Sequence, residues 1–359
     1  MKAQIVIGAN YGDEGKGTIV ARLAKDGTNV LNILTNGGSQ RGHSILTKDG
    51  SMTFQHFGSG TYHGADNYYS AWYILNPMQF TQEYTELIVK PAHIYRDPRC
   101  RWSTPYDVMA NLIQEEQRGR KASCGMGIWN TIQRCDRQPI VTFDEFMQHP
   151  DRWPQYLESV RQYYEKFVEI PAKWRDVWQS GGVVGHFLSD CKFMYEKTEA
   201  VYLSTLSYDD LLFENGQGLM LRDTGKDTAD TTPSDTGLRY ALSMARDLGI
   251  EDITAHYVTR PYLTRHGDGH LTGQTQRTDI AATVSEDRTN HFNDHQGEFR
   301  YGLLDIPDLY GRIRDDLIRN DARMGVKLEL DVTHCDEMDR EVEFRREFEI
   351  TNFHDSAMV

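Results

Sequence analysis

The chain lacks most of the features that mark secreted, membrane-bound or zinc-binding proteins. Its five cysteines are spread from position 100 to position 335 without a CxxC pair, so neither a disulfide framework nor a zinc site is predicted. No apolar run approaches the length that spans a bilayer, and the chain opens directly on a strand pattern instead of a basic segment with an apolar core. We therefore expect a cytoplasmic protein with reduced cysteines and no membrane partner.

Positive charge is also in short supply. The chain has 39 lysines and arginines against 53 aspartates and glutamates, which gives a formal net charge of -14. A nucleic-acid-binding protein needs a basic face to displace counterions, so this balance argues against a nucleic-acid partner. We expect the ligands to be small molecules whose negative charges are met by a few local arginines and lysines.

The length and the hydrophobic pattern predict one large α/β domain. The chain has 359 residues, of which 39% are hydrophobic, and it shows no repeat, low-complexity segment or long linker. A strand pattern at Ile5–Ile7, a helical pattern from Thr18 and a second strand pattern at Val30–Leu34 favour a mostly parallel central sheet. Residues 136–204 are rich in tryptophan, tyrosine and charge, and we interpret them as a helical insertion into this domain.

The loop after the first predicted strand carries the clearest chemical signal. It has glycines at 8, 12, 15 and 17 around Lys16. Such a loop points backbone N–H groups and a helix N-terminus at a phosphate, and the lysine adds positive charge. The spacing differs from a standard P-loop, because glycine follows the lysine and Asp13 lies inside the loop. We predict a variant phosphate cradle; a tight turn beside an ordinary surface lysine is the alternative.

Further candidate ligand residues follow strand or loop patterns. Gln217 ends the strand pattern at Leu211–Gly218, and its amide can both donate to and accept from a nucleobase or ribose. The hydroxyl-rich segment Thr231–Gly237 precedes a helical pattern at Leu238–Leu248, so it serves either as an N-cap or as a phosphate site. A glycine turn at 297–302 contains Arg300.

The last strand pattern, Leu328–Val332, runs into Thr333-His-Cys-Asp336. The carboxylate of Asp336 suits the donor groups of a base. Metal binding by the His-Cys-Asp trio is the rival interpretation, although adjacent residues at a strand end rarely converge on one ion.

Taken in order, these motifs resemble the adenylosuccinate synthetases over essentially the whole chain. The family's GDEGKG, GGxNAGH, EGAQG, YTTRxGxG and TKLD motifs match residues 12–17, 37–43, 214–218, 262–269 and 333–336. The resemblance implies a C–N ligase that phosphorylates the 6-oxygen of a purine monophosphate and then displaces phosphate with L-aspartate. It also implies Mg²⁺ and a homodimer.

The resemblance assigns roles to individual residues. Asp13 is the implied base, which removes the N1 proton of the purine, and His43 is the implied acid. The implied Mg²⁺ ligands are Asp13 and the Gly42 carbonyl. The implied nucleotide-phosphate residues are Gly12, Glu14, Gly15, Lys16, Gly17 and Gly42, with Asp336 for the donor base. The implied purine-monophosphate residues are Asp13, Gln40, Ser123, Arg134, Gln217, Thr232 and Ser234, and those for aspartate are Gln296 and Arg300.

The chain also departs from the family pattern. It is short, as in the archaeal and bacteriophage members, and it most resembles bacteriophage members that convert dGMP for 2-aminoadenine DNA; a phage enzyme would work in the host cytoplasm. Gln40-Arg41 replaces Asn-Ala, His334 replaces a lysine, and Arg300 alone survives from the arginine turn, with Arg265 as a possible substitute. We therefore expect dGMP with ATP or dATP, and IMP with GTP as the alternative.

The dimer and the class of activity leave further alternatives. The arginine that the family lends across its dimer maps to Arg134, with Arg137 as the alternative. A phosphate-loop nucleotide kinase or switch shares the first loop but explains neither Gln217 nor the arginine turn. A catalytically silent nucleotide-binding protein would not need both Asp13 and His43.

Overall fold

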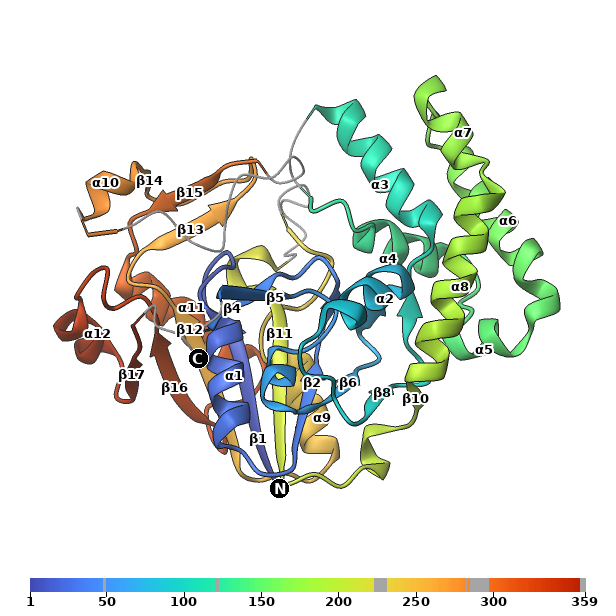
Figure 1. Cartoon of the computed structure of the whole chain (residues 1–359). Coiled ribbons are helices and arrows are strands. Elements are labelled where there is room, and N and C mark those ends of the chain that lie inside the picture. The colour runs from blue at the N-terminus through green and yellow to red at the C-terminus, as the bar shows by residue number, and fades with distance from the viewer. Residues whose placement is uncertain (48–49, 120–122, 223–230, 282, 285–296, 356–359) are drawn as a thin grey trace.

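A parallel sheet of nine strands forms the centre of the molecule (Figure 1). The computed structural model describes residues 1–47, 50–119, 123–222, 231–281, 283–284 and 297–355. In sheet order the strands are β10 (Glu199–Ala200), β8 (Ile94–Arg96), β6 (Asp66–Tyr69), β2 (Val30–Leu34), β11 (Asp210–Gly218), β1 (Lys2–Gly8), β12 (Ile253–Thr259), β16 (Lys327–Val332) and β17 (Thr351–Phe353). All neighbouring pairs are parallel, which confirms the predicted fold class.

The alternation of side chains along the central strands explains how both faces are covered. Val6, Leu212 and Val258 point to one face and form a small cluster with Ile19 and Val20 of helix α1 (Lys16–Asp26). The alternate residues of these strands point to the opposite face, where they pack with α9 (Arg239–Asp247), α11 (Ile306–Arg319) and α12 (Glu341–Glu347). Because both faces are buried, the strands are apolar almost throughout.

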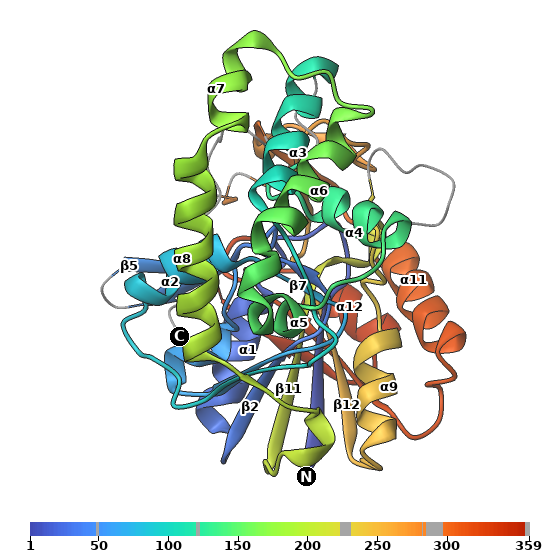
Figure 2. The same ribbon diagram turned by 90° about the vertical axis from the view of Figure 1, so that its right-hand side faces the viewer.

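A helical lobe flanks the β8 and β10 side of the sheet (Figures 1 and 2). Its helices are α2 (Pro77–Glu86), α3 (Pro105–Arg118), α4 (Ile128–Arg137), α5 (Phe143–Gln148), α6 (Trp153–Glu165), α7 (Arg175–Trp178) and α8 (Gly181–Lys197). All of them except α4 contribute to one aromatic-rich core, in which Phe146 and Phe187 both lie against Trp102. Helices α5 to α8 fall within residues 136–204; that this segment is an insertion remains a prediction.

Short elements complete the described part of the chain. The short 3-10 helices are η1 (Ser59–His63), η2 (Pro150–Arg152), η3 (Ala172–Trp174), η4 (Leu203–Thr205) and η5 (Leu219–Leu221), and α10 spans Arg277–Ile280. Three small sheets contain β3 (Gly37–Gly38), β7 (Tyr73–Leu75) and β9 (Arg101–Trp102); β4 (His43–Thr47) and β5 (Gly50–Phe54); and β13 (Leu263–His266), β14 (Gln274–Thr275) and β15 (Phe299–Gly302). No helix in the described ranges is long and apolar enough to cross a membrane.

Two local predictions were wrong. The segment with Arg300 is strand β15, not a turn, and it pairs antiparallel with β13 so that Arg300 lies opposite Arg265. Helix α9 is not capped by the Thr231–Gly237 hydroxyls. Its N-cap is Leu238, whose N–H donates to Asp316 Oδ2 at 3.0 Å, because a buried carboxylate from α11 takes the place of a local cap.

Candidate active site

Two cavities meet at the phosphate loop, beyond the carboxyl ends of β1 and β11. The larger has a volume of about 510 Å³ and the smaller about 70 Å³. The residues that line both are Asp13, Lys16, Gly42, His43 and Ser44. Ligands of open α/β sheets bind at this end of the strands, so the position fits a two-substrate site with its reacting atoms at the junction.

Glu14 holds the loop in shape. Its Oε1 accepts the N–H groups of Asn10 (3.0 Å) and Gly12 (2.8 Å), and its Oε2 lies 2.7 Å from Lys16 Nζ. Gly8 must lack a side chain, because a Cβ there would lie 2.4 Å from Glu14 Oε2. The side chain of Glu14 is thus engaged inside the protein. The predicted binding of nucleotide phosphate by this residue would therefore use its backbone and not its carboxylate.

Asp13 lies at the junction in a conformation that few residues other than glycine adopt. Its φ is +61°, and its backbone carbonyl accepts a hydrogen bond from Arg260 Nε at 2.7 Å. Such strain persists where surrounding contacts fix it, and it is common at functional sites. Burial raises the pKa of the Asp13 carboxyl, while the charges of His266, Arg260 and Lys16 oppose the rise. A carboxylate with a raised pKa is the better proton acceptor near neutral pH.

His43 faces the same junction and is fixed by Glu214. His43 Nδ1 lies 2.5 Å from Glu214 Oε1, and Ser59 donates to Glu214 through Oγ (2.7 Å) and N (3.0 Å). Burial would raise the pKa of Glu214, but the Arg41 charge and the His43 hydrogen bond hold it at about 2, so Glu214 is ionised. The contact with Glu214 assigns a proton to Nδ1, so the approach of Arg41 Nη2 to the same atom at 2.8 Å is a close contact between two donors and not a hydrogen bond.

That tautomer leaves His43 Nε2 as an acceptor. Burial and the neighbouring Arg41 charge lower the pKa of His43 to about 4, so its ring is neutral at pH 7 in the protein alone. To donate to a phosphoryl oxygen, as the predicted acid must, Nε2 first has to take up a proton. The negative charge of a bound polyphosphate favours that uptake.

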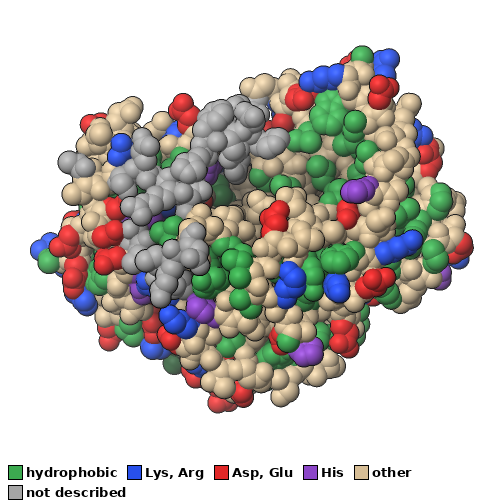
Figure 3. All heavy atoms as spheres, in the orientation of Figure 1, with side chains coloured by type: hydrophobic (Ala, Val, Ile, Leu, Met, Phe, Trp, Pro, Cys, Tyr) green, Lys and Arg blue, Asp and Glu red, His purple; other side chains and the backbone are tan. Residues whose placement is uncertain are grey.

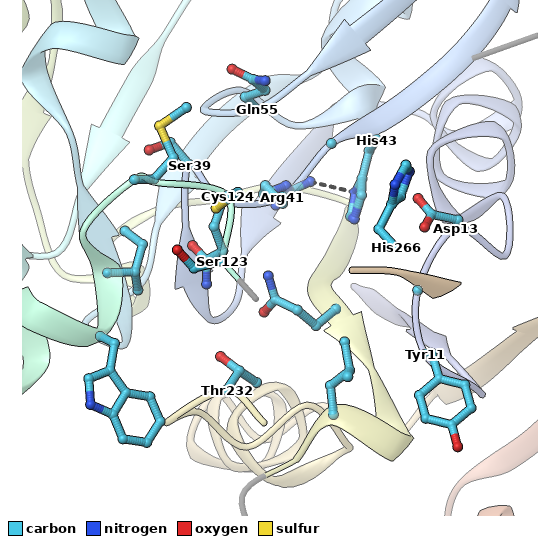
Figure 4. A pocket seen from close by; sticks show the side chains of 18 of the residues that line it. Tyr11, Asp13, Ser39, Arg41, His43, Gln55, Ser123, Cys124, Thr232 and His266 are labelled. Carbon is cyan, nitrogen blue, oxygen red and sulfur yellow. Dashed lines mark hydrogen bonds between the residues drawn. The ribbon is translucent and has the colours of Figure 1, made fainter. Parts of the chain in front are cut away.

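Polar side chains predicted for the purine monophosphate come together in the larger cavity. Gln40, Gln217, Ser123 and Thr232 line it, and Figure 4 labels the two hydroxyl residues. The amide oxygens of both glutamines have no hydrogen-bond partner among the described residues. Ser123 Oγ is engaged with Asn111 at 3.1 Å. Ser234 is not a lining residue: its Oγ accepts from Asn36 Nδ2 at 3.0 Å, which supports the loop that carries Gln40.

Arg134, which is predicted to reach a partner's phosphate, is engaged inside its own chain. Its side chain is 3% exposed. Its guanidinium donates to both oxygens of Asp107 (2.8 and 3.0 Å), to the Trp102 carbonyl and to Tyr156. Since these four contacts use its donors inside the helical lobe of the single chain, they give no support to that role, which stays a prediction. Arg137, the alternative, is exposed at the end of α4.

The structure describes one of the two residues that are predicted to bind aspartate. Gln296 lies outside the described residues. Arg300 donates to Gln274 Oε1 at 2.7 Å and to the Gly269 carbonyl, and it does not line either cavity. Arg265, the possible substitute, does line the larger cavity, and its guanidinium lies 5.0 Å from the Tyr11 ring centre.

The smaller cavity lies under the loop that follows β16. Thr333 and His334 line it, and Thr333 Oγ1 donates to the Glu14 carbonyl at 2.7 Å. Gly15 and Gly17 line it as well; a Cβ on Gly17 would approach the Ser44 carbonyl to 2.9 Å. Asp336, predicted for the donor base, is exposed and lies outside this lining set.

Three basic side chains at the site were not predicted as site residues. Arg41 lies against His43, Arg260 holds Asp13, and His266 is drawn between the His43 ring and the Asp13 carboxylate in Figure 4. Arg41 and His266 fall inside quoted motifs, and Arg260 two residues before one. Of the three residues, only Arg41 is marked in the sequence, because it departs from the family pattern beside a predicted catalytic residue.

The comparisons with known proteins agree on one family. The adenylosuccinate synthetase family model matches residues 5–314. Adenylosuccinate synthetase of Neisseria gonorrhoeae is 25% identical over 314 residues, covering 83% of this chain and 71% of its own. That of Dehalococcoides mccartyi is 29% identical over 312 residues, covering 84% and 72%.

Solved structures share the fold. Fully ligated adenylosuccinate synthetase from Plasmodium falciparum has a TM-score of 0.74 at 16% identity, over 95% of this chain and 78% of that one. Cyanophage S-2L succinoaminodeoxyadenylate synthetase, bound to dGMP and to dATP as an energy donor, has a TM-score of 0.64 at 12% identity, over 99% and 91%.

Proposed function

The chain belongs to the adenylosuccinate synthetase family of C–N ligases, and we propose that it joins L-aspartate to the 6-position of dGMP with ATP or dATP as phosphoryl donor. The product is the succinylated 2-aminoadenine deoxynucleotide. The cyanophage synthetase with dGMP and dATP supports this choice, because 91% of its length aligns with this compact chain.

The observation that carries the choice of dGMP lies in the larger cavity. Among the described residues, no donor reaches the amide oxygens of Gln40 and Gln217, so both oxygens are available to a ligand in this cavity. Guanine has a 2-amino group that hypoxanthine lacks, and this group supplies two N–H donors to such acceptors. An unpaired buried acceptor is costly, which favours the purine that pairs it.

The junction of the cavities supplies the groups for both steps. Asp13 takes the N1 proton of the purine, so that O6 attacks the γ-phosphorus and the bond to the β-phosphate oxygen breaks. Protonated His43 and Lys16 stabilise the phosphoryl oxygens as charge moves to the leaving diphosphate. The amine of L-aspartate then attacks C6, inorganic phosphate leaves with the former O6, and the amine proton goes to solvent.

Oxygen groups at the junction fit Mg²⁺. Asp13 offers a carboxylate and Gly42 a backbone carbonyl, and both residues line both cavities. In the described ranges no three His, Cys, Asp or Glu side chains cluster as metal ligands. Mg²⁺ usually takes one or two protein ligands and completes its shell with water and phosphate oxygens, so these two residues would hold it. When bound, it neutralises charge on the phosphates.

The quaternary structure belongs to the same proposal. We infer a homodimer in which Arg137, exposed at the end of α4, reaches the partner's purine phosphate. On the face in Figure 3 basic and acidic side chains are interspersed, so individual arginines must supply the positive charge for a dianion.

A substrate competition tests the function. Equal concentrations of dGMP and IMP are supplied with L-aspartate, Mg²⁺ and ATP, and the succinylated products are separated by mass; parallel reactions replace ATP by dATP or GTP. Predominant product from dGMP supports the proposal. Predominant product from IMP with GTP would identify an ordinary adenylosuccinate synthetase, the activity named for the curated relatives. Phosphate release that does not depend on aspartate would indicate a kinase or switch.

A further inference from the structure

A buried guanidinium lies behind the histidine of the junction. Arg41 Nη2 lies 2.8 Å from His43 Nδ1 and forms an ion pair with Glu214 Oε1. The side chains of Arg41 and Glu214 are both 0% exposed. The pair is therefore not a solvated surface contact. Other contacts inside the protein must offset the free-energy cost of burying its two charges.

Glu214 Oε1 is the point on which the cluster converges. It accepts from His43 Nδ1, from Ser59 Oγ and from Arg41, while Oε2 accepts from Ser59 N. A buried carboxylate needs a counter-charge, and Arg41 supplies it. Because Arg41, Ser59 and His43 converge on one carboxylate, the ring is held with Nδ1 toward Glu214 and Nε2 toward the junction.

The remaining donors of Arg41 show how limited its other contacts are. Nε and Nη1 have no hydrogen-bond partner among the described residues. Among those residues, the guanidinium forms its ion pair with Glu214, and its Nη2 lies beside His43 Nδ1. A change at Arg41 therefore acts on the orientation of these two side chains; because Arg41 also lines the larger cavity, KM has to be measured beside kcat to separate this effect from substrate binding.

We propose that Arg41 is a positioning residue for the phosphoryl-transfer step: it clamps Glu214 and thereby fixes the ring orientation and tautomer of His43. This rests on the proposed function only in that His43 serves the phosphoryl group. It does not depend on which purine is bound, because the contacts lie behind the ring.

A double-mutant cycle between Arg41 and His43 tests the proposal. Arg41→Met is made alone and in His43→Ala, and kcat and KM are measured for dGMP and for IMP with ATP. In the parent, Arg41→Met is expected to lower kcat on the order of tenfold or more, with KM nearly unchanged, because a misplaced acid loses part of its contribution of roughly 10²-fold. In His43→Ala the same change should cost less than about twofold, since an effect transmitted through His43 disappears with it.

Two further variants keep the outcome interpretable. Arg96→Met removes another buried, ion-paired arginine, 2.7 Å from Asp144 and away from both cavities, so it reports the general cost of such a loss. If Arg41→Met does not fold, Arg41→Lys takes its place in the cycle, because the charge is kept while the planar fork is lost.

Equal losses of kcat in both backgrounds would overturn the proposal, as would a loss confined to KM or a loss no larger than that of Arg96→Met. Turnover of IMP but not dGMP would refute the proposed substrate. The double-mutant cycle could then still be measured with IMP.

Discussion

Lys16 Nζ lies 2.7 Å from Glu14 Oε2, and the two side chains are only 3% and 1% exposed. The lysine of the phosphate loop is therefore paired before any nucleotide arrives. The same carboxylate accepts two loop N–H groups, so it sets the curvature of the cradle and the position of its cation together.

We expect Glu14→Ala to destabilise the protein strongly. The change leaves the Lys16 ammonium buried without a partner, which typically costs about 3 to 5 kcal/mol of unfolding free energy. Urea denaturation followed by circular dichroism measures it. The double variant Glu14→Ala/Lys16→Met removes the stranded charge and should recover part of the loss; a single variant as stable as the parent would show that the pair does not hold the loop.

Asp13→Asn and His43→Ala should each lower kcat by about 10²-fold or more, because positioned proton transfer is typically worth that much. Both variants should still fold; the melting temperature of Asp13→Asn should stay close to that of the parent, whereas His43→Ala also removes a hydrogen bond from the buried Glu214 carboxylate. For Asp13→Asn, the exchange of ¹⁸O between the β-γ bridge and the β-phosphate of ATP, without aspartate, should also be lost. Normal exchange in that variant would refute the assignment of Asp13 as the base.

Arg134→Ala and Arg137→Ala should separate a structural arginine from a ligand-binding one. Removing Arg134 strands the buried Asp107 carboxylate, so we expect a loss of about 3 to 5 kcal/mol in stability. Arg137→Ala should leave stability unchanged and raise the KM for dGMP if the residue reaches the partner's phosphate. Mixed dimers of Arg137→Ala and Asp13→Asn subunits should then regain activity at one site; dimers that remain inactive would argue against a shared site.

The sequence predicted the sheet and the phosphate loop well, because local patterns determine both. The apolar runs around Ile5, Ile33 and Phe213 became central strands, since parallel strands buried on both faces need such runs. Four glycines around Lys16 similarly left few alternatives to a cradle.

Predictions that depended on long-range contacts were weaker. The partner that caps α9 is Asp316, which lies 78 positions from Leu238 in the chain, and no local pattern indicates it. Arg134 was matched by family order, whereas its role is set by Asp107 across the helical lobe. The burial of Arg41 against Glu214, 173 positions later, likewise becomes visible only when the loop between β3 and β4 is brought against β11.

Acid should weaken a cluster at the other edge of the sheet. Burial would raise the pKa of Asp331, but hydrogen bonds from His256 (2.9 Å) and His354 (2.7 Å) hold it at about 2, below its usual 3.8. A carboxyl whose folded pKa is depressed stabilises the protein above the unfolded pKa and loses that effect as pH falls toward the folded one.

The stability difference between the parent and Asp331→Asn should therefore shrink by about 1 kcal/mol between pH 5 and pH 3. Urea titrations at both pH values measure it, with the exposed Glu251→Gln as the control. A difference that stays constant would show that the carboxylate is not stabilised in the folded protein.

Substitution of the two cavity glutamines should change which purine is preferred. If Gln40 or Gln217 accepts the 2-amino group, its replacement by leucine removes an acceptor that dGMP uses and IMP does not. The ratio of kcat/KM for dGMP over IMP should then fall roughly tenfold or more, the usual consequence of leaving one buried polar group unpaired. Ser123→Ala provides the comparison: we propose that Ser123 contacts the phosphate, which both nucleotides share, so its loss should leave the ratio unchanged. If neither glutamine variant alters the ratio while Ser123→Ala lowers both rates, discrimination at C2 does not come from these amides.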